Sequence, residues 1–459
     1  MDELKNRLFY RQKNGYDLLA PSDRLACEEY CRGYMDYLNL ARTEREAGRE
    51  AIRLAEAAGF APLQPGRGAI APGEKVYWSN RGKALLLAVG GAEPMSAGCH
   101  VAAAHVDAPR LDLKQLPVYE DSELCYFRTH YYGGIKKYQW TALPLELHGT
   151  ACLRDGSSVD IVIGREPGDP RFVITDLLPH LAKDQEQKKL GEGIEGERLC
   201  LLVGSVPYAG EGEDRVKLAV LSILEERFGI CEEDFISAEL EAVPALDVCE
   251  IGLDRSLIGG YGQDDRVCAY AELAAILSLE TPRRTAVCIL ADKEEIGSYG
   301  VTGMTSQSFE WFINELAGGV CATQQCFAKS LCISADVTAG FDPLYPEVSE
   351  KRNMSKLNYG VSLCKFTGAR GKSGASDASA ELVGTLRRLF AGQGIVWQMA
   401  EMGKVDQGGG GTVALYMAQR NIDTIDAGVP VLSMHSPFET TAKLDCYMTY
   451  RAVKAVFEE

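Results

Sequence analysis

The first part of the chain combines helical spacing of apolar residues with short runs that are almost wholly apolar. Apolar side chains recur at near-helical spacing over residues 22–58, where Thr43 and Glu46 match the pattern of a capping box. Residues 84–89 are a continuous apolar run, and residues 100–104 are apolar after His100; both have the length of a strand. The pattern therefore predicts helices over residues 22–58, followed by two buried strands.

The pattern changes between about residue 116 and residue 245. Apolar and polar positions alternate over residues 145–153, which can pair with residues 159–163 across an Asp155-Gly156 turn. The polar residues 184–197 predict a mobile surface loop. We therefore expect residues 116–245 to form a β-rich insertion.

Strand-like and helix-like segments alternate after residue 250. The expected helices are 266–279, 309–316 and 377–390, and the expected strands are 286–291, 331–335, 395–399 and 431–434. This alternation favours an α/β sheet with helices on both faces. We expect residues 1–115 and 246–459 to build that sheet as one discontinuous domain, interrupted by the insertion.

Composition narrows the classes of function. The 459 residues suggest two domains or one large core with an insertion, and 46% hydrophobic with 25% charged residues is ordinary for a globular protein. A net charge of −17 disfavours binding to nucleic acid or to an anionic membrane. The chain contains no apolar run near the roughly 20 residues that span a bilayer, and its start does not resemble a signal peptide, so we expect a cytoplasmic protein.

Cysteine usage supports a reduced environment. The 15 cysteines are odd in number, are spread singly, and never form Cys-x-x-Cys. We expect them to be mostly thiols in the core.

Side chains that bind metals follow several of the apolar runs. The segments are His105-Val106-Asp107, Asp264-Asp265, Asp292-Lys293-Glu294-Glu295, Ser334-Ala335-Asp336 and Met434-His435-Ser436. Sites in open α/β sheets form beyond the carboxyl ends of the strands, where such side chains converge. Imidazole and carboxylate without thiolate suit zinc, manganese or cobalt, and one carboxylate can bridge two ions about 3.5–4 Å apart. The combination predicts a two-metal hydrolase.

Each feature taken alone also has a simpler interpretation. His105 could be a core histidine bonded to Asp107, and Asp264 could be only the cap of the following helix. Glu294 and Glu295 could be a solvated turn. The conjunction of all these groups favours the metal site.

Four of the segments resemble the motifs of the aspartyl aminopeptidase and vacuolar aminopeptidase I family of dizinc exopeptidases. They are His105-Val106-Asp107-Ala108-Pro109-Arg110, Asp292-Lys293-Glu294-Glu295-Ile296-Gly297-Ser298, Ile333-Ser334-Ala335-Asp336 and Leu432-Ser433-Met434-His435-Ser436. The resemblance covers almost the whole chain, including the insertion. It implies a dizinc exopeptidase-type α/β/α sheet core with an inserted β-rich dimerisation domain.

The resemblance also implies the metal ligands. His105 would bind one ion and His435 the other, with Asp264 bridging the two. Glu295 and Asp336 would complete the ligand set. The ions would be two divalent cations, most often Zn²⁺, with Co²⁺ or Mn²⁺ as alternatives.

Two further carboxylates would act beside the ions. Asp107 would orient His105, and Glu294 would be the general base that takes a proton from the attacking water. The resemblance further implies a cis peptide bond between Asp264 and Asp265. Together these residues imply a metallo-aminopeptidase that removes N-terminal residues from short peptides.

Specificity and assembly follow from the resemblance as well. Lys365 resembles a basic pocket residue, and His180 resembles a segment that reaches a neighbouring subunit's active site. The residues after Asp336 depart from those of aspartyl members, so an acidic and a neutral first residue both stay open. The resemblance implies a homo-oligomer, a dodecamer built from dimers.

Two alternatives are distinguishable by experiment. One is a two-metal deacylase or amidase with the same core, which would act on acylated amino acids. The other is a non-catalytic oligomeric assembly protein, which the complete set of candidate ligands disfavours.

Overall fold

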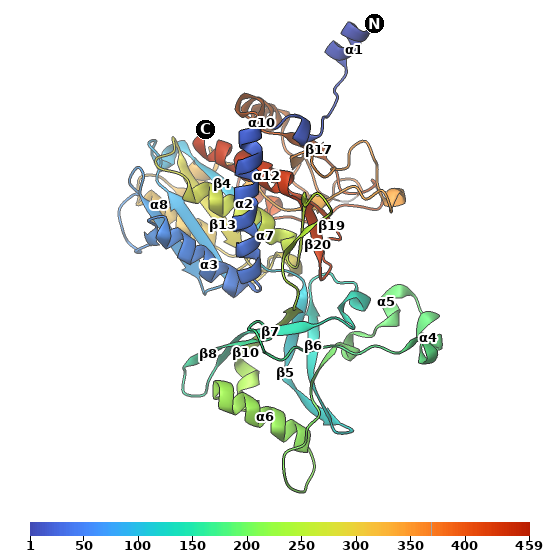
Figure 1. The fold of residues 1–459 in the computed structure, drawn as a ribbon. Helices are drawn as coiled ribbons and strands as arrows, with labels where there is room; N and C mark the ends of the chain where they lie inside the picture. The colour runs from blue at the N-terminus through green and yellow to red at the C-terminus, as the bar shows by residue number, and fades with distance from the viewer. Residues whose placement is uncertain (369) are drawn as a thin grey trace.

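Two parts of unequal size make up the molecule. The computed structural model describes all residues except 369. Among the described residues the strands form three sheets. The larger part holds a nine-stranded sheet wrapped by helices, and the smaller part below it holds a six-stranded sheet (Figure 1).

The nine-stranded sheet is the core of the larger part. Its strands in spatial order are β1 (Ala61–Pro62), β2 (Lys75–Asn80), β3 (Ala84–Val89), β13 (Thr285–Ala291), β4 (Cys99–His105), β14 (Leu331–Ser334), β18 (Asp423–Gly428), β16 (Val361–Cys364) and β17 (Trp397–Ala400). The central strand β4 runs parallel to β13 and β14. Every residue of β3, β4 and β13 is buried, because both faces of the sheet are covered.

Helices cover the two faces. One face packs against α2 (Pro21–Leu40), α3 (Glu44–Ala57), α7 (Gln263–Leu277), α10 (Ala380–Gln393) and α12 (Lys443–Glu458). The other packs against α8 (Ser308–Ala317), α9 (Thr323–Phe327) and α11 (Ala414–Gln419). Alternate residues of one strand enter different cores: Ala102 and Ala104 face the first group, and Val101 and Ala103 the second. The predicted α/β sheet with helices on both faces is confirmed.

The smaller part is an antiparallel sheet with one long helix. Its strands in order are β8 (Ser158–Ile163), β7 (Leu145–Cys152), β10 (Ala238–Pro244), β5 (Arg110–Asp121), β6 (Leu124–Tyr132) and β9 (Cys200–Gly204). The helix α6 (Arg215–Phe228) packs on this sheet. Strands β7 and β8 form the predicted hairpin. Strand β5 begins at Arg110, so the sheet starts ahead of the expected boundary at residue 116.

Short helices occupy part of the predicted loop over residues 184–197. They are α4 (Lys183–Glu186), α5 (Leu190–Gly193) and η5 (Gly196–Arg198), and a further short helix, η4 (Pro179–Leu181), lies just before the loop. The polar composition correctly places this segment at the surface, but local backbone bonding still forms single helical turns there.

A third, five-stranded sheet contains the expected strand over residues 431–434. Its order is β11 (Cys249–Ile251), β12 (Leu257–Gly260), β20 (Glu439–Ala442), β19 (Pro430–Leu432) and β15 (Thr338–Ala339). Strand β18 ends at Gly428 and occupies the position in the main sheet that residues 431–434 were expected to take. The chain then turns into β19. A Cβ atom at Gly428 would lie 1.8 Å from the carbonyl oxygen of Asp336, so this turn requires glycine.

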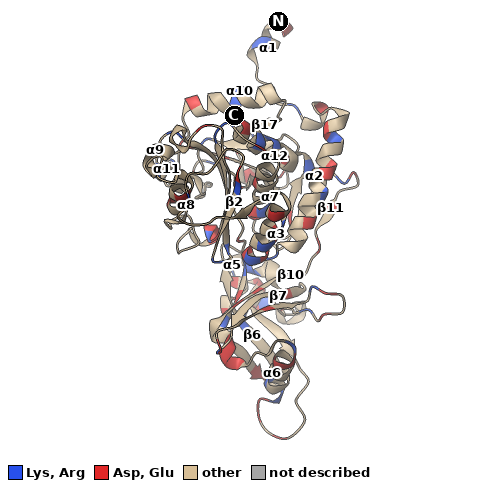
Figure 2. Ribbon diagram, turned by 90° about the vertical axis from the view of Figure 1, so that its left-hand side faces the viewer, with Lys and Arg blue, Asp and Glu red and all other residues tan. Residues whose placement is uncertain are grey.

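The N-terminal helix and many of the charged residues lie at the surface. Helix α1 (Asp2–Leu8) extends away from the body of the larger part (Figure 1). Figure 2 shows acidic and basic residues interspersed along the ribbon of both parts. Within the described residues, no helix combines the length and apolar character needed to cross a membrane.

Candidate metal centre

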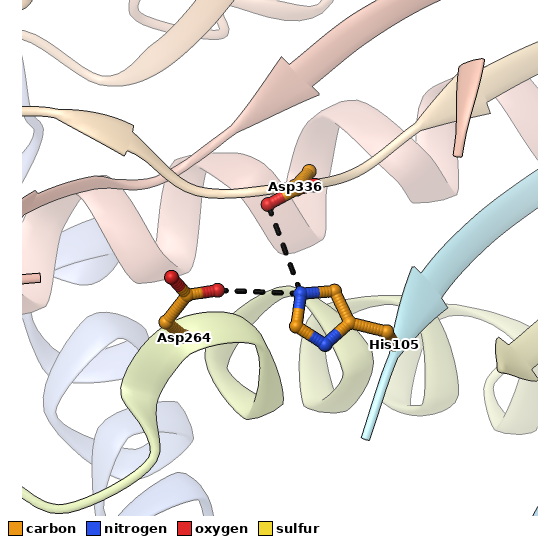
Figure 3. Close-up of side chains that lie close together, drawn as sticks. All are labelled: His105, Asp264 and Asp336. Atoms are coloured by element: carbon orange, nitrogen blue, oxygen red, sulfur yellow. Dashed lines mark ion pairs between the residues drawn. The ribbon is translucent and has the colours of Figure 1, made fainter. Parts of the chain in front are cut away.

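Two groups of metal-binding side chains meet at Asp264. In the first group, His105 Nε2 lies 3.3 Å from Asp264 Oδ1 and 4.0 Å from Asp336 Oδ1 (Figure 3). In the second, His435 Nε2 lies 3.1 Å from Asp264 Oδ2 and 3.6 Å from Glu295 Oε1. The donor atoms of each group lie within 4.8 Å of one another. One carboxylate therefore presents a different oxygen to each imidazole.

The donors fit a pair of divalent cations. Each group combines one imidazole with two carboxylates, a set that suits zinc. Among the described residues, Glu295 Oε1 is a buried oxygen without a hydrogen-bond partner. A buried carboxylate oxygen in that state is costly unless a cation or donor satisfies it, which supports metal binding at this position.

Strand ends bring the groups together. His105 ends β4, and Asp336 follows the end of the neighbouring strand β14. Glu294 and Glu295 open the short helix η7 (Glu294–Ile296) after β13, and Asp264 lies at the start of α7. His435 follows β19 in a left-handed conformation with φ of 63°. Four of these five positions arise at carboxyl ends of strands, as predicted, although His435 comes from the third sheet. The Asp264–Asp265 peptide bond is cis, as the resemblance implies.

Asp107 links the first histidine to the turn that carries the two glutamates. His105 Nδ1 lies 3.0 Å from the main-chain oxygen of Asp107 and 3.4 Å from its Oδ1. The carboxylate also accepts hydrogen bonds from the backbone N–H groups of Glu294, at 3.1 Å, and Glu295, at 3.2 Å. With Nδ1 engaged in this way, His105 presents Nε2 to the metal-binding group.

Glu294 lies beside the ligand groups and not within them. Its Oε2 is 3.9 Å from His105 Nε2, and 17% of its side chain is exposed. Burial raises the pKa of Glu294 to about 7. A carboxylate with that pKa can both accept and release a proton near neutral pH.

Several residues of the site carry no clear sequence signal. Glu439, in β20, accepts hydrogen bonds from the backbone of His435 at 2.7 Å and of Asp264 at 3.1 Å. The carbonyl of Gly134 lies 2.9 Å from His435 Nδ1, and the hydroxyl of Tyr132 donates to Asp107 at 2.8 Å. For Glu439, a charged residue that begins a strand and is followed by two threonines is a weak signal. The other two become visible only through the fold.

The two expected substrate residues do not belong to either ligand group. Lys365 Nζ donates to Asp377 at 2.8 Å in an exposed pair. His180 is exposed in η4, next to α4 at the outer edge of the smaller part (Figure 1). Their assignment to substrate binding stays a prediction.

This fold and site define a class of protein. An α/β sheet that gathers two histidine-carboxylate groups around one shared aspartate, with a free glutamate beside them, is typical of two-metal hydrolases.

Comparisons identify the family within that class. The family model for aminopeptidase I zinc metalloproteases (M18) matches residues 37–457. A probable M18 family aminopeptidase 1 from Clostridium acetobutylicum is 43% identical over 98% of this chain and 99% of its own length. A crystal structure of an M18 family aminopeptidase from Thermotoga maritima superposes with a TM-score of 0.94 at 43% identity, covering 98% of this chain and 100% of that chain. The S. cerevisiae mApe1 dodecamer has a TM-score of 0.75 at 19% identity, covering 93% of this chain and 96% of that chain, and shows a shared fold.

The chain belongs to the M18 family. It is a zinc-dependent aminopeptidase, and the deacylase and assembly-protein alternatives are not favoured.

Proposed function

We propose that the chain removes single N-terminal residues from short peptides at the two ligand groups described above. The observation that carries this proposal is the Asp264 carboxylate, whose two oxygens face the imidazoles of His105 and His435. We assign His105, Asp264 and Asp336 to one zinc ion. Asp264, Glu295 and His435 are assigned to the other.

Glu294 would move the proton in the reaction. When bound, the zinc pair supplies Lewis acidity toward water and the scissile carbonyl. The Glu294 carboxylate takes the proton from the attacking water and then delivers it to the leaving amine. Asp107 holds His105 and the 294–295 turn in place through the hydrogen bonds given above. Attraction of the free α-amino group to the carboxylates of Asp264 and Glu295 would select peptide amino termini.

We also propose an oligomeric state and a cellular location for this chain. By analogy with the dodecameric relative, this chain forms a homo-oligomer, with residues 116–245 as a separate domain that makes the dimer contact. Closed assemblies restrict access, which would favour short peptides. Lys365 and His180 would contact substrate, the latter in a neighbouring subunit. We propose a cytoplasmic location.

Hydrolysis of a panel of aminoacyl substrates tests this function. The panel includes acidic and neutral first residues and N-acetylated versions of each. We expect cleavage of the free-amine substrates only, loss of cleavage after chelation, and recovery on adding zinc, manganese or cobalt. Cleavage of only the acetylated compounds would instead support a deacylase, and failure of all substrates with zinc restored would contradict the proposal.

A further inference from the structure

The segment Tyr132–Gly134, where β6 ends, reaches both ligand groups. The Tyr132 hydroxyl donates a 2.8 Å hydrogen bond to Asp107 Oδ2, on the side of His105. Two residues on, the carbonyl oxygen of Gly134 lies 2.9 Å from His435 Nδ1. A histidine whose Nδ1 is held by an oxygen acceptor carries its proton there and leaves Nε2 free for a cation. One short segment of the smaller part thus contacts the His435 imidazole directly and the His105 imidazole through Asp107.

Gly133 lies between these two contacts and against a third residue of the site. Its φ is +73°, and a Cβ there would lie 3.1 Å from Glu295 Oε2 and 3.4 Å from Pro109 Cγ. Both the backbone conformation and the lack of space favour glycine. The Tyr132–Gly134 segment therefore packs directly on the glutamate of the second ligand group.

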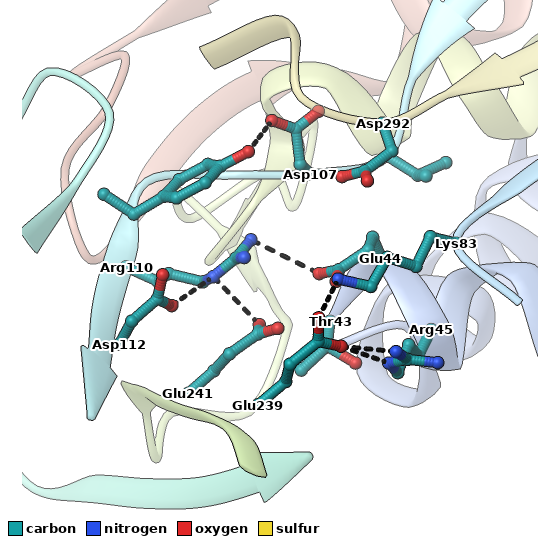
Figure 4. Close-up of polar contacts among 12 residues, drawn as sticks. Thr43, Glu44, Arg45, Lys83, Asp107, Arg110, Asp112, Glu239, Glu241 and Asp292 are labelled. Carbon is teal, nitrogen blue, oxygen red and sulfur yellow. Dashed lines mark hydrogen bonds and ion pairs between the residues drawn. The ribbon is translucent and has the colours of Figure 1, made fainter. Parts of the chain in front are cut away.

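A buried ionic network fixes the tyrosine ring. The Arg110 guanidinium lies 3.9 Å from the centre of the Tyr132 ring. Arg110 is in turn held by Asp112 Oδ1 at 2.8 Å, by Glu241 Oε2 at 3.1 Å and by Glu44 Oε2 at 3.3 Å (Figure 4). Glu44 begins α3 in the larger part, whereas Glu241 lies in β10 of the smaller part. The network joins both parts of the molecule near Asp107, the residue that contacts His105. Figure 4 shows Asp107 and Arg110 in the same view.

We propose that Tyr132, Gly133 and Gly134 form a clamp that positions both zinc-binding histidines. The β-rich insertion would then be needed to hold the metal centre in its active geometry. This inference rests on the proposed function. Tyr132 acts through Asp107 and is a positioning residue. Gly134 acts through its backbone carbonyl, and Gly133 allows the segment to approach Glu295. The insertion thus contributes to catalysis without supplying a metal ligand.

Tyr132→Phe tests the clamp, with Tyr131→Phe as the matched control. The first change removes the hydroxyl and keeps the ring, while Tyr131 is a 43% exposed neighbour on the same strand. Loss of a direct partner of a metal ligand typically lowers metal affinity or activity about 10–100-fold, and Tyr132 supports His105 one contact further out, through Asp107. We expect Tyr132→Phe to lose zinc at a correspondingly lower chelator concentration and to lower kcat with little change in KM. Tyr131→Phe should match the unsubstituted chain in zinc content, kcat and melting temperature.

A glycine pair keeps the inference testable if Tyr132→Phe does not fold. Gly133→Ala and Gly156→Ala both place alanine at positive φ, but only the former would contact the site, since Gly156 has open space around it. We expect zinc retention to fall for Gly133→Ala and to stay unchanged for Gly156→Ala. Equal zinc retention in both pairs would overturn the clamp. An unsubstituted chain that binds no zinc would overturn the proposed function together with it.

Discussion

Asp264 is buried, yet it must remain ionised to hold the site together. Burial raises the pKa of this carboxyl, but the imidazoles of His105 and His435 outweigh that effect and lower its pKa below the usual value. Its backbone N–H is bound by Glu439, whose own pKa burial raises to about 8. The negative charge is thus concentrated on the carboxylate placed between the two histidines, where cations would bind.

Glu294→Gln should abolish turnover without releasing zinc. The amide keeps the shape of the side chain but cannot accept a proton, and loss of a general base typically costs about 10²–10⁴-fold in rate. Glu294 is not in either ligand group, so metal content should stay near that of the unsubstituted chain. Steady-state kinetics and metal analysis are the measurements, with the exposed Glu347→Gln as control. Near-normal activity in Glu294→Gln would show that another group moves the proton.

The sequence predicted the side chains that converge and missed those that hold them. His105, Asp264, Glu295, Asp336 and His435 could be expected to meet because they follow strands or resemble family motifs. The partners depend on tertiary contacts instead. Tyr132 resembles any strand tyrosine, and Gly134 acts through a carbonyl that every residue has, so no pattern in the chain could reveal either role.

At the scale of elements, β4 is the strand on which the larger part is organised. It lies between β13 and β14, and its end carries His105. Near its start, the buried His100 has a pKa that burial lowers to about 4, with Arg284 adding to the effect. The two histidines of one strand therefore differ in chemistry: one is held by carboxylates, and the other stays neutral in an apolar and cationic environment.

His100 should make stability depend on pH. An unfolded histidine binds a proton below about pH 6.5, whereas folded His100 does so only below about pH 4. Unfolding therefore takes up a proton between these values, and the free energy of unfolding falls as the pH drops from 6.5 to 4. The expected loss is on the order of 2–3 kcal/mol. Urea unfolding of the chelated protein at pH 7 and pH 4.5 should show a smaller loss for His100→Gln, and equal losses in both chains would contradict this assignment.

Elements with a strong local pattern were predicted more accurately than their place in a sheet. Residues 84–89 form β3 with the predicted bounds, and Thr43 caps α3 by accepting from the N–H of Glu46 at 3.2 Å. The strand near residue 431 was expected in the main sheet but pairs with β20. Its apolar character is the same in either sheet, and only the turn after Gly428 decides between them.

At the scale of the molecule, the smaller part has apolar side chains that stay exposed to solvent in a single chain. They include Leu218 and Ile223 on α6, which are 51% and 55% exposed. These two residues are five positions apart and so lie on different sides of the helix, and exposed apolar side chains of this kind can mark an interface. This location fits the proposed dimer contact through residues 116–245.

Charging that helix should disrupt assembly. We expect the unsubstituted chain to have a solution mass several times that of one 50.0 kDa chain. The double variant Leu218→Asp and Ile223→Asp should shift the mass to smaller species, because an interface cannot bury two new charges without partners. Leu25→Asp on α2, also exposed, serves as control. Light scattering gives the masses, and a monomeric unsubstituted chain would disprove the assembly.

The order of strands in the main sheet has a consequence for how the protein is synthesised. Strands β3 and β4 leave the ribosome early, but both pair with β13, which follows the entire β-rich stretch in the chain. At about 5–20 residues per second, roughly ten seconds or more separate their synthesis. During that interval residues 99–104, which are apolar except for His100, have no partner strand, so we expect the nascent chain to depend on chaperones. His435 follows every other proposed metal ligand in the chain, so the proposed ligand set is complete only after residue 435 has been synthesised.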